Sequence, residues 1–402
     1  MAGGGARGAY EAGVLNYLFE ELPKRLGKQI EFRVVCGTSV GAIHAAFLAA
    51  TANLDSGRGE LLNRIWDRMR VDEIFRFTTR DMLRIPGRML GVRRIARQLR
   101  EGQRPDRLYG LLDTRPLERL VLESIPWRNI RRNLRAGLLD AVCVTTTQIA
   151  TGHAVVFVEQ KDRSLPHWAS QDSLRMQPIR LSPMHTLASA AIPLLFPAVR
   201  IGARYYADGG LRLNTPLAPA VRLGADRILV IGLTQETGPK ISEAIAQERT
   251  AEFGNPLYLF GKVLNALMLS PIDADVARLH FVNDIIETGS KVFGDDFLTR
   301  LNSGLDPSGS LPLRRIKDLV IRPSEDLGRM AAEVVRNDPK LELGAFLGLL
   351  RRSTGAGSTA KEADLLSYLL FDAAYALPLA DLGYKDAEAR QDELAAFFTD
   401  DD

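Results

Sequence analysis

The pentapeptide Gly37-Thr38-Ser39-Val40-Gly41 has the spacing of a serine nucleophile held in a tight turn. Residues 32–36 before it are mostly apolar and include two valines, which predicts a buried strand. Residues 40–51 after it are rich in alanine and contain no proline, which predicts a helix. Between a strand and a helix, such a turn presents the serine hydroxyl at the positive end of the helix. We therefore expect Ser39 to be a nucleophile rather than an ordinary turn residue.

A second cluster of small residues opens the chain and precedes apolar residues at helical spacing. It consists of Gly3, Gly4, Gly5, Ala6, Arg7 and Gly8. The N–H groups of consecutive glycines before a helix can point at an anion. These glycines also fit the Gly-x-Gly-x-x-Gly pattern of dinucleotide sites, which needs an acidic residue at the end of the next strand. That strand ends instead in the Ser39 turn, and Glu31 lies at its start. An oxyanion hole is therefore the better interpretation of this loop.

Asp208-Gly209-Gly210 follows an apolar run with two prolines at residues 188–199. By itself, an aspartate before two glycines indicates only a turn. Together with the two glycine motifs in this order, however, it resembles the patatin-like phospholipase family. Residues 188–197, Asn214 and Pro216 add to the resemblance, which covers roughly the first 235 residues.

The resemblance implies both a fold and a reaction. The fold would be a three-layer α/β/α sandwich with a mainly helical C-terminal extension. The reaction would be the hydrolysis of a lipid ester by a serine–aspartate dyad without histidine, with Ser39 as nucleophile and Asp208 as base. The region of Gly4 and Gly5, with Arg7 nearby, would form the oxyanion hole. Gly3 and Gly8 of the same loop would also belong to the oxyanion hole. The glycines of the turn and of the aspartate motif would be Gly37, Gly41, Gly209 and Gly210.

This mechanism needs no metal or cofactor, and the sequence contains no cluster of histidine, cysteine and carboxylate residues at metal-ligand spacing. The lipid itself stays open between phospholipid, lysophospholipid and neutral glyceride.

Histidine offers an alternative mechanism, because the order Ser39, Asp208, His280 matches the triad of the α/β-hydrolases. That fold places several strands before its nucleophile, and His280 falls in a helical pattern rather than a loop. We interpret all five histidines as structural or surface residues: His44, His153, His167, His185 and His280. An esterase or thioesterase dependent on His280 remains one alternative. A non-catalytic lipid-binding relative is another, against which the presence of both Ser39 and Asp208 argues.

Composition fits an enzyme with a large core, since 46% of the 402 residues are hydrophobic. A net charge of only +3 predicts no general attraction to nucleic acid. Cys36 and Cys143 lie in apolar strand-like runs, so we expect buried, reduced thiols. The sequence has no signal-peptide pattern at its start and no apolar run long enough to span a bilayer. We expect a cytoplasmic protein, in peripheral contact with the membrane.

The expected membrane contact is the segment from Arg58 to Arg107, which has 14 arginines, no lysine and 7 acidic residues, a net charge of +7. Large apolar residues are interleaved with the arginines, a combination that suits an anionic lipid surface. Solvated faces of covering helices would give the same composition, with the arginines paired to carboxylates.

Strand-like runs at residues 32–36, 140–145, 153–159 and 227–231 alternate with helical stretches, which predicts a sheet covered on both faces. We divide the chain into a catalytic core at residues 1–235 and a mainly helical region at residues 236–402. A strand at residues 316–322 should return to the core sheet. In the family that the chain resembles, a strand precedes the glycine loop, whereas here only Met1 and Ala2 do. We therefore expect that strand to be incomplete, and a form extended by about ten residues to be more active and to melt higher.

Overall fold

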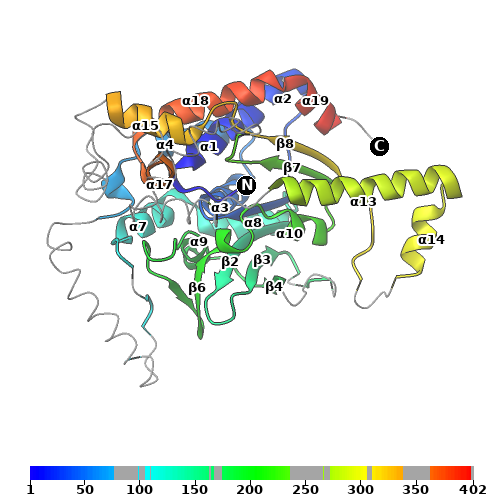
Figure 1. Ribbon diagram of the computed structural model, residues 1–402, viewed down its shortest axis with the longest axis horizontal. Coiled ribbons are helices and arrows are strands. Elements are labelled where there is room, and N and C mark those ends of the chain that lie inside the picture. Colours follow the sequence, from blue (N-terminus) through cyan, green and yellow to red (C-terminus); the bar gives the residue numbers. More distant parts are fainter. Residues whose placement is uncertain are drawn as a thin grey trace, which may run out of the picture.

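The computed structural model describes residues 1–76, 98, 105–108, 110–162, 164–166, 174–235, 266, 272–305, 310–337 and 363–399 (Figure 1). Its central sheet has six strands: β1 (Val34–Thr38), β2 (Ala141–Gln148), β3 (Ala154–Gln160), β4 (Leu174–Pro178), β5 (Val199–Ile201) and β6 (Arg204–Asp208). Five follow the order β4-β3-β2-β6-β5, and β1 also pairs with β2. The runs expected from the sequence near β1, β2 and β3 are strands within a few residues of the predicted limits.

The edge of β2 opposite β3 is shared by two strands that approach each other. β1 runs parallel to the first part of β2 and ends with Thr38 opposite Thr145. β6 runs antiparallel to the last part of β2 and ends with Asp208 opposite Thr146. The C-terminal ends of β1 and β6 therefore meet at adjacent positions of β2. This register brings together Asp208 and the residue that follows β1, which is Ser39.

Successive side chains of a strand point to opposite faces of the sheet. All residues of β2 are buried, so both faces of the sheet are covered at this strand. Val142 and Val144 of β2 join a large hydrophobic cluster that includes residues of α3 (Val40–Thr51), α8 (Trp127–Ala136) and α9 (Pro183–Ser189). Cys143 joins a second cluster on the other face, against α10 (Leu217–Arg222). The structure thus confirms the predicted α/β/α layering and the predicted burial of the free thiols of Cys36 and Cys143.

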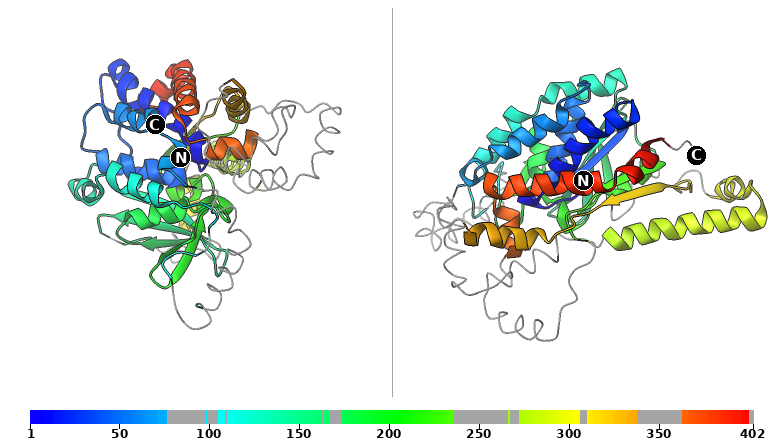
Figure 2. Two further views of the ribbon diagram at one scale, coloured as in Figure 1. Left: turned by 90° about the vertical axis from the view of Figure 1, so that its left-hand side faces the viewer. Right: turned by 90° about the horizontal axis from the view of Figure 1, so that it is seen from above.

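Further helices surround this core. The N-terminal ones are α1 (Gly8–Asn16), which continues through a π-helical turn into α2 (Leu22–Leu26), then α4 (Arg58–Asp67) and α7 (Arg115–Ser124). The C-terminal ones are α13 (Ile272–Phe293), α14 (Phe297–Ser303), α15 (Leu327–Asn337), α17 (Ala363–Leu369), α18 (Ala373–Ala389) and α19 (Gln391–Thr399). Figures 1 and 2 show α13 extending away from the body of the molecule, whereas α18 lies along α1.

The contact between α18 and α1 is close enough to require glycine on both helices. A Cβ on Gly13 would lie 1.9 Å from the carbonyl oxygen of Ala380, and one on Gly383 would lie 2.1 Å from that of Tyr10. Buried side chains of α17, α18 and α19 belong to the same hydrophobic cluster as those of α1 and α3. Helices α17, α18 and α19 therefore share a core with the N-terminal part of the chain.

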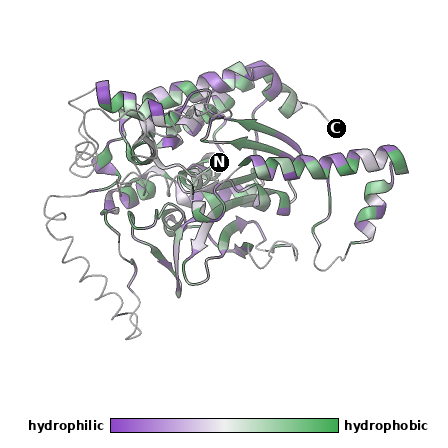
Figure 3. Cartoon of the chain, viewed as in Figure 1, coloured by the Kyte–Doolittle hydropathy of each residue, from purple (hydrophilic) through white to green (hydrophobic). Residues whose placement is uncertain are grey.

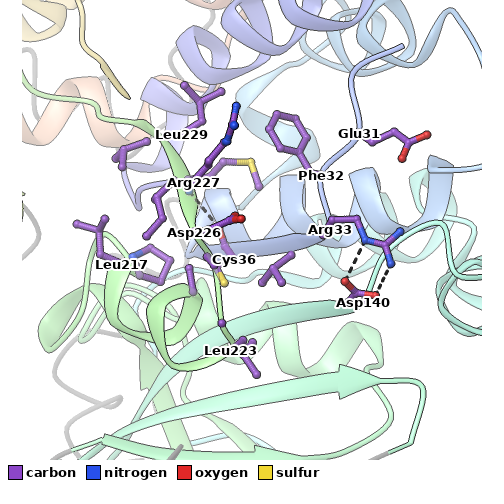
Figure 4. Close-up of a pocket in the computed structure, with 18 of the residues that line it drawn as sticks. Glu31, Phe32, Arg33, Cys36, Asp140, Leu217, Leu223, Asp226, Arg227 and Leu229 are labelled. Atoms are coloured by element: carbon purple, nitrogen blue, oxygen red, sulfur yellow. Dashed lines mark hydrogen bonds and ion pairs between the residues drawn. The ribbon is translucent and has the colours of Figure 1, made fainter. Parts of the chain in front are cut away.

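The strand expected at residues 316–322 is β8 (Lys317–Ile321), which pairs in parallel with β7 (Arg227–Ile231). Figure 3 shows both strands as mainly hydrophobic. In the described parts of the chain, no ladder joins this two-stranded sheet to the sheet of six strands. A cavity of about 410 Å³ lies between β1 and β7, and the ion pair of Arg33 and Asp140 lines it (Figure 4).

Candidate active site

Ser39 lies in the sharp turn between β1 and α3 and is almost fully buried. Its backbone has φ 55° and ψ −122°, a conformation that is costly for a residue with a side chain. The flanking glycines make room for the turn. A Cβ on Gly37 would lie 1.9 Å from the carbonyl oxygen of Gly41, and one on Gly41 would lie 2.7 Å from that of Ala2. The local geometry is that of a nucleophile elbow.

Asp208 ends β6 and is completely buried. Its backbone is held firmly: its N–H donates to the carbonyl of Ala191 at 2.9 Å, and its carbonyl accepts from the Thr147 hydroxyl at 2.9 Å. One carboxylate oxygen, Oδ1, accepts a hydrogen bond from the N–H of Gly210 at 2.8 Å. The other oxygen, Oδ2, has no hydrogen-bond partner among the described residues. Asp208 therefore has one oxygen that fixes its orientation and one that is available to accept a proton.

Burial raises the pKa of Asp208 to about 7, because the ionised carboxylate loses its hydration. The Gly210 N–H and the neighbouring Ser39 hydroxyl act in the opposite direction, since both stabilise the ionised form. A base with a pKa near neutrality takes up a proton far more readily than an exposed aspartate.

Ser189 of α9 links the Ser39 turn to β2, a role that the sequence does not predict. Its Oγ accepts the N–H of Ser39 at 2.8 Å, and its hydroxyl donates to the carbonyl of Thr145 at 2.6 Å. The same carbonyl leaves no space for a side chain at Gly209, whose Cβ would lie 2.4 Å away. Ser189, which binds the N–H of Ser39, and Gly209, which follows Asp208, thus both lie against Thr145 of β2.

The glycine loop begins beside Ser39. A Cβ on Gly3 would lie 3.0 Å from the Ser39 Cβ. The N–H of Gly3 donates to the backbone oxygen of Asn214 at 3.2 Å and to its Oδ1 at 3.1 Å, and the Asn214 amide donates back to the Gly3 carbonyl at 3.1 Å. No described residue accepts a hydrogen bond from the N–H of Gly4 or Gly5. These two groups, unlike that of Gly3, remain free for a ligand.

The rest of the loop is fixed by α17, a contact that the sequence does not predict. The Arg7 Nε donates to the Ser367 hydroxyl at 2.9 Å, and the guanidinium lies 4.4 Å from the centre of the Tyr368 ring. A Cβ on Gly5, which has φ +57°, would lie 2.2 Å from the Tyr368 carbonyl oxygen. Gly8 packs against α3, where a Cβ would lie 2.4 Å from a methyl group of Val40.

His280 is not part of this arrangement. It lies on α13, with more than half of its side chain exposed, and its Nε2 is 2.9 Å from Oδ1 of Asp318. His44, His153 and His185 are not hydrogen-bonded to Ser39 or Asp208 in the described part of the chain, and His167 lies outside it. The described structure therefore assembles a serine and an aspartate without a histidine.

Two further expectations concern metals and membranes. The described residues include no group of three or more histidine, cysteine or carboxylate side chains that could hold a metal ion. Among the described helices, none combines the length and apolarity needed to cross a bilayer.

Most of the arginine-rich segment, residues 77–97 and 99–104, lies outside the described residues. At its two ends, Arg58 donates to the Ile30 carbonyl at 2.5 Å, and Arg107 pairs with Glu118 at 2.5 Å. These two arginines are engaged within the protein, whereas the membrane contact expected of the segment stays a prediction.

Comparisons with known proteins find a family model that matches more than half of the chain. The family model described as patatin-like phospholipase matches residues 1–221. A curated relative, the cGAMP-activated phospholipase of Pseudomonas aeruginosa (strain BWHPSA011 / Pa011), is 27% identical over 272 residues, covering 63% of this chain and 68% of the relative. The crystal structure of VipD from Legionella pneumophila aligns over 98% of this chain and 66% of that protein, slightly under two thirds of it. Its identity of 12% and TM-score of 0.33 are too low to carry an argument about the fold.

Proposed function

Because the chain belongs to the patatin-like phospholipase family, we propose that it is a lipid acyl hydrolase that uses Ser39 as nucleophile and Asp208 as general base. The observation that supports this most directly is the meeting of β1 and β6 on one edge of β2. In that register a serine in a strained turn lies beside a buried carboxylate, one oxygen of which has no hydrogen-bond partner in the described part of the chain. A stable turn does not need a buried, half-satisfied carboxylate, whereas a catalytic base does.

In the proposed reaction, the Ser39 hydroxyl oxygen attacks the carbonyl carbon of the ester while Oδ2 of Asp208 takes the hydroxyl proton. The tetrahedral intermediate then expels the alcohol, which receives that proton, and leaves an acyl group on Ser39. A water molecule attacks the acyl-enzyme, Asp208 again accepts a proton, and the fatty acid leaves as Ser39 regains its own proton. The same carboxylate thus serves as base in the first half-reaction and restores the serine in the second.

The oxyanion of both tetrahedral intermediates would be held by the N–H groups of Gly4 and Gly5, together with that of Val40 at the positive end of α3. Gly3 has a different part in this proposal, because its N–H is already bound to Asn214. Gly3 positions the start of the loop, Arg7 holds its end to α17, and Gly8 allows the loop to approach α3.

We further propose that the enzyme acts from the cytoplasm on lipid esters of an anionic membrane surface. The support is the net charge of +7 between Arg58 and Arg107, combined with the interleaved large apolar residues. The reaction itself requires only the dyad and the loop, so it extends to soluble esters with short acyl chains.

The test of the proposed function is covalent labelling of Ser39 with a fluorophosphonate probe, followed by assays on phospholipid vesicles and on a soluble ester. Ser39→Ala should lose the label and both activities. Ser303→Ala, at the end of α14, is the matched control and should retain all three. Persistent labelling and hydrolysis in folded Ser39→Ala would show that another residue is the nucleophile.

A further inference from the structure

Glu11 is a fully buried carboxylate that the proposed chemistry does not use. It lies in the first turn of α1, one residue after Tyr10, and none of its surface is exposed. Carboxylates are almost never buried to this extent unless they are paired. Both oxygens of Glu11 have partners: Oε1 accepts the N–H of Ala2 at 2.7 Å, and Oε2 is 2.9 Å from Nδ1 of His44 on α3.

The direction of this hydrogen-bond chain follows from its third member. The indole N–H of Trp66, on α4, donates to Nε2 of His44 at 3.2 Å. An indole nitrogen can only donate, so Nε2 of His44 must be unprotonated. A neutral His44 then carries its proton on Nδ1 and donates it to Glu11. The Glu11 carboxylate therefore receives one hydrogen-bond donor on each oxygen.

The chain of hydrogen bonds ends on the backbone of the glycine loop. Ala2 precedes Gly3, and the Ala2 carbonyl lies against Gly41, two residues after the nucleophile. The start of the loop is thus held from two sides, by Glu11 at Ala2 and by Asn214 at Gly3. Without the Glu11 carboxylate, the Ala2 N–H would be buried without an acceptor, and the loop could regain one only by moving.

We propose that Glu11 is a positioning residue for the oxyanion hole: its buried carboxylate fixes Ala2 and thereby sets where the N–H groups of Gly4 and Gly5 lie relative to Ser39. This inference rests on the proposed function, in which those two groups hold the oxyanion. His44 and Trp66 orient the carboxylate, so three N-terminal helices, α1, α3 and α4, determine the position of one loop. The competing explanation is that the network only joins these helices.

Glu11→Gln is the test, because it keeps the shape and removes the charge. One oxygen of glutamine can accept a hydrogen bond, but its NH₂ group would face either the Ala2 N–H or the His44 Nδ1–H. We expect kcat on a soluble ester to fall about 10- to 100-fold with KM within about threefold, because misplaced donors weaken only the binding of the transition state. The rate of fluorophosphonate labelling of Ser39 should fall in parallel.

Glu20→Gln is the matched control. Glu20 also lies in the N-terminal helical stretch, and its two oxygens accept the N–H groups of Gly57 and Gly59 at 2.9 Å. It therefore ties down backbone as Glu11 does, but at the start of α4 rather than at the glycine loop. The two variants should lose comparable melting temperature, whereas only Glu11→Gln should lose kcat and labelling rate.

Equal kcat and labelling rates for the two folded variants would overturn the inference and leave Glu11 a structural residue. If Glu11→Gln does not fold, Glu11→Asp replaces it, since it retains the charge but draws the carboxylate back by one methylene group. Glu11→Asp should label more slowly than the wild type, and a wild-type rate would again overturn the inference. Failure of the proposed function is distinguishable, because Ser39→Ala would then keep its activity whatever happens at Glu11.

Discussion

Glu11 and Asp208 are both fully buried carboxylates, yet their surroundings differ in one respect that separates structure from chemistry. Glu11 has a hydrogen-bond donor on each oxygen, from the Ala2 backbone and from His44. Asp208 has a backbone donor on Oδ1, while Oδ2 has no hydrogen-bond partner among the described residues. A satisfied carboxylate can hold a loop but has little capacity to accept a proton. A carboxylate with one unsatisfied oxygen is costly to bury in its ionised form, which raises its pKa and lets it act as a base near neutral pH.

The largest expected effect comes from removing the half-satisfied carboxylate. Asp208→Asn should lower kcat by on the order of a thousandfold or more, because an amide cannot take the proton of Ser39. The double variant with Ser39→Ala should be no worse than either single variant, since the two residues act as one unit. Kinetics of the three variants on a soluble ester measure this. Full activity in folded Asp208→Asn would remove the contrast between the two carboxylates.

The second prediction concerns pH, because the pKa of Asp208 is raised to about 7. Below that pH the carboxylate is protonated and cannot act as a base, so kcat/KM should rise about tenfold per pH unit up to pH 7 and then level off. At pH 5 the activity should be about a hundredfold below the plateau. A pH–rate profile that is flat between pH 5 and 8 would be incompatible with Asp208 as the base.

Stability should change with pH in the opposite direction. A buried carboxyl whose pKa is raised from 3.8 to about 7 keeps a proton in the folded state that the unfolded chain has already lost. This contribution to the free energy of unfolding is present at low pH and is lost as the pH rises from about 4 to about 7. Asp208→Asn should lack this loss, so its melting temperature relative to the wild type should be higher at pH 8 than at pH 5.

The third prediction tests the loop that Glu11 and α17 hold in place. Gly5→Ala puts a Cβ 2.2 Å from the Tyr368 carbonyl oxygen at φ +57°, so the loop must move, and we expect a loss of kcat of about 10- to 100-fold. Gly27→Ala is the control, because Gly27 has φ +67° but nothing within 4 Å of its Cβ position. It should cost about 1 kcal/mol of stability and no activity. Similar kinetics for the two variants would show that the loop tolerates displacement.

The fourth prediction separates membrane contact from chemistry. Charge reversal at Arg93, Arg94 and Arg97, which lie outside the described residues, should weaken binding to anionic vesicles by about tenfold or more. Wild-type binding should itself weaken as salt is raised. Hydrolysis of a soluble ester should be unchanged, because it needs only the two buried residues and the loop. An equal loss on vesicles and on the soluble ester would make the segment structural.

Much of the site could be predicted because its signals are local. The glycines around Ser39 and after Asp208 mark turns with no room for side chains, and the apolar runs mark β1, β2 and β3. The supporting residues could not be predicted, because Ser189 and Ser367 are ordinary serines until folding brings them to the Ser39 N–H and to Arg7. The sequence also gives no sign that Asn214 accepts a hydrogen bond from the N–H of Gly3, one of the glycines predicted to form the oxyanion hole.

Glu11 and His44 did leave a signal in the sequence. Glu11 is the only carboxylate in α1, and His44 is the only titratable residue in α3; most of their neighbours in the sequence are apolar or small. A polar or charged group alone in a buried helix needs a partner, and two such helices in contact with each other can provide partners for each other. Helical spacing predicted both helices but not their contact, because that depends on how α1 and α3 pack in three dimensions.

The smallest expected effect is at His280, the histidine that would convert the dyad into a triad. His280 lies on an exposed face of α13 and is hydrogen-bonded to Asp318 of β8. His280→Ala should therefore change kcat on a soluble ester by less than about threefold. A histidine that took the proton from Ser39 would instead cost on the order of a thousandfold when removed, as Asp208 is expected to. The two variants, assayed side by side, therefore decide which residue accepts the serine proton. A collapse of activity in His280→Ala, together with only a mild loss in Asp208→Asn, would show that His280 rather than Asp208 is the base.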